Sequence, residues 1–478
     1  MVSTTFAALL PLALAGFASA LNNGLARTPQ MGWNTWNTFA CNISQDTILS
    51  AARAIKAERL DQYGYNYVVI DDCWQADQRD PGTNILQANK EKFPNGLKGV
   101  VDEIKSLGLK AGIYSSAGVQ TCGRHIGSLG YEDVDAQSWS NDGFEYLKYD
   151  NCFNQGQQGT PKLSFDRYNA MSQALNKTTG DPILYSMCNW GEDWPWLFAT
   201  EIANSWRISG DIYPSFNRDD DRCPCTDITT CNLQGFHCSI AKILDFAASL
   251  GQKAYPGAWN DLDMLEVGNR GLSLDESLVH FSMWAMVKSP LILGNDLTKM
   301  TNQTRAIIKN KHVIDISQDP TGSPAVRLWK KPEDDGNTQL WKIQLSNGTY
   351  AVAAINVSES PKNVTISMDN VFYDEYLSGE DLQDEAWNVY DLWRGIDFSK
   401  DPTEPASMST MKVGGGPFSC KLPEVTVPKH GIKLYKLTPA TGNSGSAQKR
   451  SKDGLDKATR EFDEIRPSRI MGSQAFAI

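Results

Sequence analysis

Between residues 30 and 310, short apolar segments alternate with longer segments in which apolar residues recur with helical spacing. The apolar segments have the length of buried strands and lie at Met31–Trp36, Tyr67–Ile70, Lys110–Tyr114, Tyr146–Tyr149, Ile183–Met187, Ser205–Ile208, Ala258–Leu262 and Pro290–Leu293. The helical segments lie at Asp46–Tyr63, Leu97–Leu107, Phe165–Lys177, Ser239–Leu250, Leu274–Lys288 and Gln303–Lys309. The stretches after the third and fifth apolar segments show no clear periodicity. Strands that alternate with helices in this way are typical of a (β/α)8 TIM barrel, which we expect over residues 21–320.

The pattern changes after Pro324. The apolar segments become short and rich in aromatic and β-branched residues, with turn residues and no helical segment between them. They lie at Val326–Trp329, Thr338–Gln344, Thr349–Asn356, Val364–Ile366, Trp387–Asp391 and Gly431–Leu437. This pattern predicts an antiparallel β-sandwich over residues 325–440. From Thr441 the chain is polar and then charged, with a dibasic Lys449-Arg450, so we expect residues 441–478 to form a disordered or processed tail.

The N-terminal segment, residues 1–20, has the pattern of a secretory signal peptide. An apolar run from Phe6 to Phe17 is followed by Ala18-Ser19-Ala20, which resembles a cleavage site. The run is shorter than the ~20 residues that span a bilayer, and no later apolar stretch is long enough either. We therefore expect residues 1–20 to be removed and the protein to be secreted, without a membrane partner.

Cysteines and glycosylation sequons fit an exported protein. Ten cysteines in such a chain indicate disulfides. Asn-x-Ser/Thr sequons, the acceptors of N-glycans, occur at Asn42, Asn176, Asn302, Asn347, Asn356 and Asn363. A metal site is the alternative for the group Cys223, Cys225, Cys231, His237 and Cys238. Cys223 and Cys225 lack the two-residue spacing that is usual in zinc sites, so disulfides are favoured and no metal is expected.

Charge and aromatic content narrow the function classes. A formal net charge of −11, without a basic stripe before residue 440, argues against nucleic acid as a partner. The 14 tryptophans and 16 tyrosines suit a large core or a carbohydrate site, where flat rings cover the apolar face of a sugar. Composition alone does not choose between these two uses.

Polar and reactive residues follow most of the predicted barrel strands, on the face where barrel enzymes keep their active sites. They are Asp71 and Asp72, Tyr114, Lys148 and Asp150, Cys188 and Trp190, Arg207 and Asp211, and Asp261 and Asp263. Structural explanations exist for single members of this set. Asp71-Asp72 would suit a helix N-cap, Asp150 an ion pair with Lys148, and Asp211 a turn cap. Six groups around one ring are hard to explain by surface solvation, so we expect a catalytic site at this face.

Two carboxylates beside aromatic rings and hydroxyl-binding groups are typical of glycoside hydrolysis. One carboxylate attacks or directs water, and a protonated one assists the leaving oxygen. Lys148 lies two residues before Asp150, on the same face of a strand, and favours the ionised form of that carboxylate. The sequence contains no GxGxxG, P-loop, HExxH or nucleophile-elbow motif, so no cofactor is expected.

Several sequence blocks resemble the signature blocks of the glycoside hydrolase family 27 α-galactosidases of the secreted fungal type. The blocks are Met31-Gly32-Trp33-Asn34-Thr35-Trp36, Asp71-Asp72-Cys73-Trp74, Gly112-Ile113-Tyr114, Lys148-Tyr149-Asp150-Asn151-Cys152, Arg207 to Asp211 and Gly257 to Asp263. They lie in the family order, and the resemblance extends from about residue 25 to 440. It implies a retaining exo-glycosidase that removes terminal α-D-galactose from galactosides through a covalent galactosyl-enzyme intermediate.

The resemblance also implies roles for individual residues. Asp150 matches the nucleophile and Asp211 matches the acid/base, which together imply an acidic pH optimum. Asp71 and Asp72 match acceptors of the O4 and O6 hydroxyls, and Trp33 matches the ring that covers the apolar face of the sugar. The further implied substrate contacts are Tyr114, Lys148, Cys188, Trp190, Arg207 and, as a weaker transfer, Gln252.

Alternatives to this activity exist within and outside the family. Family members that act on N-acetylgalactosamine have small residues in the loop after strand five, where bulky Trp190 is expected to exclude the acetamide. The Asp71-Asp72 pair leaves room for a C6 hydroxymethyl group and disfavours a β-L-arabinopyranosidase. A galactose-binding relative that lost catalysis is the other alternative, although both carboxylates are present. The choice among melibiose, raffinose-type oligosaccharides and galactomannan, and the oligomeric state, are left open.

The family pattern finally implies a disulfide set. It pairs Cys41 with Cys73 and Cys122 with Cys152, and fungal and yeast relatives imply nested bridges Cys223–Cys238 and Cys225–Cys231. Cys188 is then a free thiol near the sugar, and Cys420 lies in the sandwich.

Overall fold

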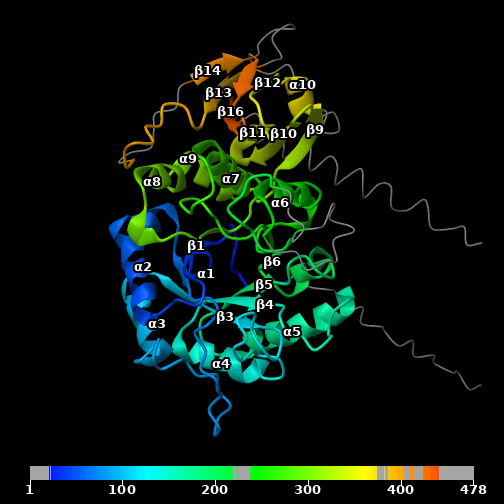
Figure 1. The fold of residues 1–478 in the computed structure, drawn as a ribbon. Coiled ribbons are helices and arrows are strands. Elements are labelled where there is room, and N and C mark those ends of the chain that lie inside the picture. The colour runs from blue at the N-terminus through cyan, green and yellow to red at the C-terminus, as the bar shows by residue number, and fades with distance from the viewer. Residues whose placement is uncertain are drawn as a thin grey trace, which may run out of the picture.

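The computed structural model describes residues 21, 23–218, 223, 237–373, 382, 386–402, 410–413, 422 and 424–440. The expected signal segment 1–20, the tail 441–478, the pair Cys225–Cys231 and Cys420 lie outside the described residues. Two large sheets organise the described part of the chain, one curled into a barrel and one antiparallel (Figure 1).

Eight parallel strands form the barrel, in the order β7-β6-β5-β4-β3-β2-β1-β8. They are β1 (Met31–Asn34), β2 (Tyr67–Val69), β3 (Lys110–Ser116), β4 (Tyr146–Asp150), β5 (Leu184–Cys188), β6 (Ser205–Arg207), β7 (Trp259–Asp261) and β8 (Leu291–Leu293). Leu265, shortly after β7, closes the ring by donating its N–H to the Ile292 carbonyl at 2.7 Å. The predicted (β/α)8 barrel is confirmed, and the carboxyl ends of all strands meet at one mouth.

The helices around the barrel begin with a side-chain cap in several cases. They are α1 (Trp36–Phe39), α2 (Gln45–Ala57), α3 (Gly96–Ser106), α4 (Glu132–Asp142), α5 (Pro161–Lys177), α6 (Ile240–Ala247), α7 (Leu274–Met286), α8 (Asn302–Ile308) and α9 (Lys311–Ser317), with 3-10 turns η1 (Leu60–Tyr63), η2 (Pro195–Leu197), η3 (Ala199–Glu201), η4 (Gly251–Lys253) and η5 (Leu297–Lys299). Ser273 and Glu276 form a reciprocal capping box at α7, and Thr160 caps α5. Only the turns η2 and η3 follow β5, which explains the missing helical periodicity there.

The predicted C-terminal antiparallel sheet domain is also confirmed. Its strands are β9 (Val326–Glu333), β10 (Gly336–Leu345), β11 (Thr349–Asn356), β12 (Lys362–Val364), β13 (Trp387–Asp391), β14 (Thr410–Val413), β15 (Val425–Val427) and β16 (Ile432–Pro439), with η6 (Ser346–Gly348) and α10 (Met368–Val371) between them. Six strands form one sheet in the order β14-β13-β16-β11-β10-β9, and β12 pairs with β15. The short strands β14 and β15 and the one-turn helix α10 were not predicted from the sequence.

The antiparallel sheet domain packs against the helices α6, α7 and α9 (Figure 1). The Trp393 indole N–H donates to the Ser282 hydroxyl of α7 at 2.9 Å. The Asn310 side chain, at the start of α9, donates to the Leu392 carbonyl at 3.0 Å. The C-terminal domain is therefore joined to the barrel through these helices, and none of its described residues lines the pocket at the carboxyl ends of the barrel strands.

Three disulfides lie among the described residues: Cys41–Cys73, Cys122–Cys152 and Cys223–Cys238. These are pairs that the family resemblance implies. Cys122–Cys152 joins the loops after β3 and β4, and Cys41–Cys73 joins the segment after α1 to the loop after β2.

The sequons differ in their access to solvent. Asn42, Asn176, Asn302, Asn347 and Asn363 are exposed. Asn356 is fully buried, and its side-chain nitrogen donates to the carbonyl oxygens of Ser360, Val427 and Pro428. The expectation of a glycan at Asn356 is therefore contradicted, because a glycan on that nitrogen would break these bonds and could not fit in the core. Within the described part of the chain, every helix is too short or too polar to cross a lipid bilayer.

Candidate active site

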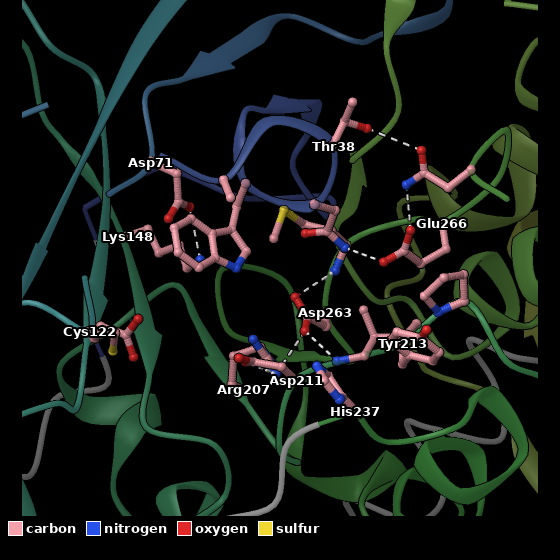
Figure 2. Close-up of a pocket in the computed structure, with 18 of the residues that line it drawn as sticks. Thr38, Asp71, Cys122, Lys148, Arg207, Asp211, Tyr213, His237, Asp263 and Glu266 are labelled. Carbon is pink, nitrogen blue, oxygen red and sulfur yellow. Dashed lines mark hydrogen bonds and ion pairs between the residues drawn. The ribbon is translucent and has the colours of Figure 1, made fainter. Parts of the chain in front are cut away.

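A pocket of about 500 Å³ opens at the carboxyl ends of the barrel strands. The predicted site residues among those that line it are Asp71, Tyr114, Lys148, Asp150, Arg207 and Asp211. Figure 2 shows Asp71 and Lys148 on one side of the pocket, and Arg207, Asp211 and Asp263 on the other. The fold thus brings both predicted catalytic carboxylates to one pocket, although 61 positions separate them in the sequence.

Asp150 is the last residue of β4 and is only 6 % exposed. The Tyr114 hydroxyl donates to its Oδ2 at 2.8 Å, and the Asn151 backbone N–H donates to its Oδ1 at 2.9 Å. Burial raises the pKa of Asp150 to about 7; Lys148 lowers this pKa, and the charge of Asp211 raises it further. The expected influence of Lys148 is present, but the loss of solvent outweighs it.

Asp71 and Lys148 form an ion pair beside Asp150. The Lys148 Nζ lies 2.8 Å from Asp71 Oδ2, which also accepts a hydrogen bond from Asn34 at 2.7 Å. Asn34 of β1 and Lys148 of β4 thus hold Asp71 between them, so the positions of both charged side chains are set before any ligand binds. A lysine that donates and a carboxylate that accepts are groups that suit adjacent sugar hydroxyls.

Asp72 lies behind Asp71 and is not among the residues that line the pocket. Its oxygens accept the backbone N–H groups of Cys73 at 2.7 Å and Gly123 at 2.6 Å. Asp72 therefore ties the loop after β2 to the loop after β3. Its predicted contact with a sugar hydroxyl stays a prediction, since each carboxylate oxygen keeps a second lone pair.

The structure corrects the assignment of the stacking tryptophan. Trp33 is fully buried, and its indole N–H donates to the Asn295 carbonyl at 2.8 Å, so it belongs to the core. Trp36 is half-buried and lines the pocket. β1 ends at Asn34 and α1 begins at Trp36, so the chain turns between the two tryptophans and only the second one reaches the pocket.

The wall formed by β6 and β7 contains a branched ion pair. Arg207 is 2 % exposed, and its Nη2 lies 3.1 Å from Asp211 Oδ1 and 2.9 Å from Asp263 Oδ2. The Asp211 side chain is 47 % exposed, so it faces the open part of the pocket. The carbonyl of Asp211 accepts the Cys238 N–H at 2.7 Å, which ties this loop to the Cys223–Cys238 disulfide.

Cys188 and Trp190 lie at and just after the end of β5. Cys188 is a buried free thiol that accepts a hydrogen bond from Arg207 Nη1 at 3.6 Å, and burial raises its pKa. It lines a small cavity of about 20 Å³ rather than the main pocket. Trp190 is half-buried and is not among the residues that line the main pocket. Its exclusion of an acetamide group stays a prediction.

Gln252 does not reach this pocket. It is exposed in η4, which precedes β7, and therefore lies towards the opposite end of that strand from the mouth. This placement contradicts the expected contact between Gln252 and a sugar bound in the pocket of the same chain.

Several pocket residues were not predicted from the sequence. Glu266 is a buried carboxyl in the loop after β7, and burial raises its pKa to about 7. It accepts hydrogen bonds from Asn37 after β1 and from Asn269, and so connects two loops of the rim. Met264 follows Asp263 directly, and Tyr213 and His237 form the outer rim near Asp211. Of these residues, only Met264 could have been expected in the pocket, because it lies close to the Trp259-Asn260-Asp261 block in the sequence.

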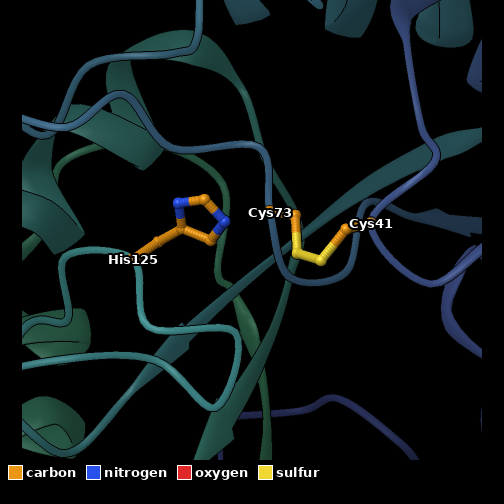
Figure 3. Close-up of side chains that lie close together, drawn as sticks. All are labelled: Cys41, Cys73 and His125. Carbon is orange, nitrogen blue, oxygen red and sulfur yellow. A yellow bond between two sulfur atoms is a disulfide. The ribbon is translucent and has the colours of Figure 1, made fainter.

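One group of potential metal ligands occurs among the described residues, and it lies outside the pocket. His125 approaches Cys41 and Cys73 (Figure 3). Both sulfurs form the Cys41–Cys73 disulfide, so neither is available as a thiolate ligand in this state.

Comparison with known proteins agrees with this geometry. A sequence model of the family described as Alpha galactosidase A matches residues 28–319, and one of the Alpha galactosidase C-terminal beta sandwich domain matches residues 335–437. The α-galactosidase of Saccharomyces mikatae is 44 % identical over 454 residues, which cover 87 % of this chain and 94 % of that protein.

Solved structures give the same result. The crystal structure of α-galactosidase I from Mortierella vinacea has 50 % sequence identity and a TM-score of 0.80, covering 88 % of this chain and 99 % of that one. The structure of α-galactosidase from Saccharomyces cerevisiae with raffinose has 41 % identity and a TM-score of 0.83, covering 87 % and 99 %. With its barrel, its C-terminal sheet and its paired carboxylates, this chain belongs to the alpha galactosidase A family.

Proposed function

We propose that the protein hydrolyses terminal α-D-galactosides with retention of configuration, with Asp150 as the nucleophile and Asp211 as the acid/base. The observation that carries the proposal is that both carboxylates line one pocket at the barrel mouth, beside an Asp71–Lys148 pair and Trp36. Two carboxyl groups around one sugar are the minimum equipment of a retaining glycosidase.

The reaction proceeds in two displacements at the anomeric carbon. In the first, an Asp150 oxygen attacks that carbon while Asp211 gives its proton to the leaving glycosidic oxygen, so the alcohol departs and a β-galactosyl ester forms on Asp150. In the second, Asp211 takes a proton from water, the hydroxide attacks the same carbon, and the Asp150 carboxylate is released. Two inversions give net retention.

The surroundings of the two carboxylates support this order of roles. Asp150 is buried and held by Tyr114 and Asn151, so its oxygens are fixed for attack on one carbon atom. Asp211 is half-exposed, so both a leaving alcohol and an incoming water molecule reach it. A nucleophile needs fixed geometry, whereas an acid/base needs access to exchanging groups.

We further propose raffinose-type galactosides as one substrate class. The relative from Saccharomyces cerevisiae whose structure holds raffinose aligns with nearly all of its length to this chain. α-N-acetylgalactosaminidase activity is the second candidate, and it is disfavoured by the bulk of Trp190 after β5. Paired chromogenic galactoside and N-acetylgalactosaminide substrates separate the two activities.

The decisive experiment is azide rescue. In Asp150→Gly, azide occupies the space of the missing carboxylate and should yield β-galactosyl azide from an activated α-galactoside. In Asp211→Gly, azide attacks the galactosyl enzyme and should yield α-galactosyl azide instead. Identification of the anomer by NMR tests both assignments, and exchanged anomers would reverse the two roles.

The remaining parts of the chain receive supporting roles in this proposal. We propose residues 21–320 as the catalytic barrel and residues 325–440 as a sandwich that braces α7 and α9, as the Trp393 and Asn310 contacts support. We also propose secretion after removal of residues 1–20, supported by the disulfides, which persist in oxidising compartments.

A further inference from the structure

Asp263, two residues beyond the end of β7, contacts the predicted acid/base segment by two routes. Its Oδ2 accepts the backbone N–H of Ile212, the residue after Asp211, at 2.8 Å. The same oxygen lies 2.9 Å from Arg207 Nη2, which also lies 3.1 Å from Asp211 Oδ1. One carboxylate therefore touches both the backbone of the Asp211 loop and its charged partner (Figure 2).

The position of Asp263 is fixed by its own surroundings. It is 5 % exposed, its backbone N–H donates to Asp261 Oδ1 at 2.8 Å, and its carbonyl accepts the Trp284 indole N–H at 2.8 Å. Its φ of 79° lies in the left-handed region, which Asp and Asn tolerate better than other non-glycine residues. A strained, anchored backbone of this kind is typical of residues that serve a site.

The hydrogen bonds around Asp263 indicate a carboxylate. Its oxygens accept the N–H groups of Ile212, Met264 and Arg207, and a carboxylate is a pure acceptor. Burial and the charge of Asp211 raise the pKa of Asp263, while Arg207, Lys148 and the Ile212 N–H oppose that rise. Since arginine stays protonated in proteins, Asp263 is the buried counter-ion of Arg207.

Asp263 matters for the proton that Asp211 has to carry, because Arg207 lies close to both carboxyl groups. An acid catalyst has to hold its proton until the glycosidic bond breaks, yet a guanidinium 3.1 Å from Asp211 favours the ionised carboxylate. The charged or titratable groups that face Asp263 are Arg207 of β6, Lys148 of β4, Asp211, Asp261 of β7, Glu266 of the loop after β7 and, through Arg207, Cys188 of β5. Lys148 is engaged by Asp71, so Arg207 is the cation that Asp263 offsets.

We propose that Asp263 is a positioning residue for acid catalysis: it holds the Asp211 loop through Ile212 and offsets the charge of Arg207, so that Asp211 carries the proton that the leaving oxygen needs. This inference rests on the proposed function of Asp211. A purely structural role, in which Asp263 only stabilises the barrel mouth, predicts a loss of stability and no selective effect on proton transfer.

The test uses substrates that differ in their need for a proton. The sucrose part of raffinose leaves as an alkoxide unless its oxygen is protonated, whereas 2,4-dinitrophenolate leaves readily without help. In the full-length Asp263→Asn enzyme, which keeps the size and the backbone preference of the residue, we expect kcat/KM for raffinose to fall about 100-fold. We expect a loss below about tenfold with 2,4-dinitrophenyl α-galactoside, and an alkaline limb of the raffinose profile that lies about one pH unit lower.

Three variants keep the test decisive. Asp135→Asn removes another buried carboxylate that pairs with an arginine, Arg79, and is expected to lower the Tm without changing the ratio between the two substrates. Asp211→Ala is the reference for lost acid catalysis and is expected to show a larger ratio still. If Asp263→Asn does not fold, Asp263→Glu keeps the charge and is expected to retain the wild-type alkaline limb.

The outcomes separate the two proposals. If Asp263→Asn lowers kcat/KM equally on both substrates and leaves the pH profile unshifted, the role of Asp263 is overturned. The acid/base assignment survives that result if Asp211→Ala still loses more activity on raffinose than on the dinitrophenyl galactoside. If the alkaline limb of the raffinose profile also moves in Asp263→Glu, which keeps the negative charge, then Asp263 does not act by offsetting the charge of Arg207. Equal losses on both substrates in Asp211→Ala overturn the acid/base assignment itself, and the inference falls with it.

Discussion

Two walls of the same pocket hold the same type of residue in different surroundings. On the β4 wall, Asp150 ends a strand, is 6 % exposed, and has hydrogen-bond donors on both oxygens. On the β6–β7 wall, Asp211 lies four residues beyond Arg207, the last residue of β6, on a loop, with 47 % of its side chain exposed. The two aspartates have the same intrinsic chemistry but differ in burial. Different surroundings of this kind allow two carboxyl groups in one site to take different roles.

The contrast also extends to how each wall is built. The β4 wall depends on strand geometry, because Tyr114 and Lys148 are register partners on β3 and β4. The β6–β7 wall depends on side-chain ties, in which Asp263 and Arg207 hold a loop that the strand no longer supports. Substitutions should accordingly act in different ways on the two walls.

The largest expected effect comes from removing the buried carboxylate. Asp150→Asn should reduce kcat by at least about 10⁴-fold on every substrate, because no other group on the β4 wall can form the ester. Steady-state rates with raffinose and with 2,4-dinitrophenyl α-galactoside measure this effect. A loss that depends strongly on the leaving group would assign Asp150 to proton transfer and break the comparison.

A smaller effect is expected from Trp36, whose indole ring lines the pocket but comes from α1 and not from either wall. Trp36→Ala should lower kcat/KM by about 10- to 100-fold, mainly through KM, because an apolar sugar face loses its covering ring. The matched control is Trp33→Phe, which loses a buried hydrogen bond and part of the buried ring and should cost about 2 kcal/mol of stability with an unchanged KM. A larger KM effect at Trp33 than at Trp36 would contradict the corrected assignment.

The pH dependence of activity sharpens the comparison further. Burial raises the pKa of Asp150 to about 7, and the charge of Asp211 raises it further. Up to about this pH the two carboxyl groups hold a proton between them, and the proposed reaction needs that proton on Asp211 when the glycosidic bond breaks. Above this pH the proton is lost, so kcat/KM for raffinose should fall about tenfold per pH unit. A rate that stays constant from pH 6 to 9 would contradict this account; recovery of activity after return to pH 5 controls for denaturation.

The smallest expected effect concerns stability. The folded-state pKa of Asp150, about 7, lies above the ordinary aspartate value, so its contribution to stability is present at low pH and is lost as the pH rises through about 7. Asp150→Asn removes this titration and should raise the Tm at pH 8 by at least about 2 °C, with little change at pH 4.

The matched variant on the other wall is Asp211→Asn, whose half-exposed carboxylate should influence the pH dependence of the Tm much less. Some slope should persist in Asp150→Asn, because burial also raises the pKa values of Glu192 and Glu266 to about 7. Parallel Tm curves for the wild type and Asp150→Asn would show that burial does not distinguish the two aspartates.

Much of the barrel could be predicted from sequence because parallel strands are buried on both faces and read as apolar runs. Every expected barrel strand lies within two residues of an observed one, from Met31–Asn34 to Leu291–Leu293. Prediction failed where the local pattern carried no such signal. No apolar periodicity marks the turns η2 and η3, and β14 and β15 are too short to stand out from their surroundings.

The sequence alone determined the order of the elements and which residues end the strands, since burial periodicity and the motif blocks are local properties. Only the tertiary structure decided which side chains share the pocket. Trp33 and Trp36 lie in one block, yet a turn between β1 and α1 sends one into the core and the other to the pocket. Asp263 likewise meets Ile212 only because β6 and β7 are neighbours in the barrel. Contacts between distant segments depend on how the sheet closes, and no spacing along the chain encodes that closure.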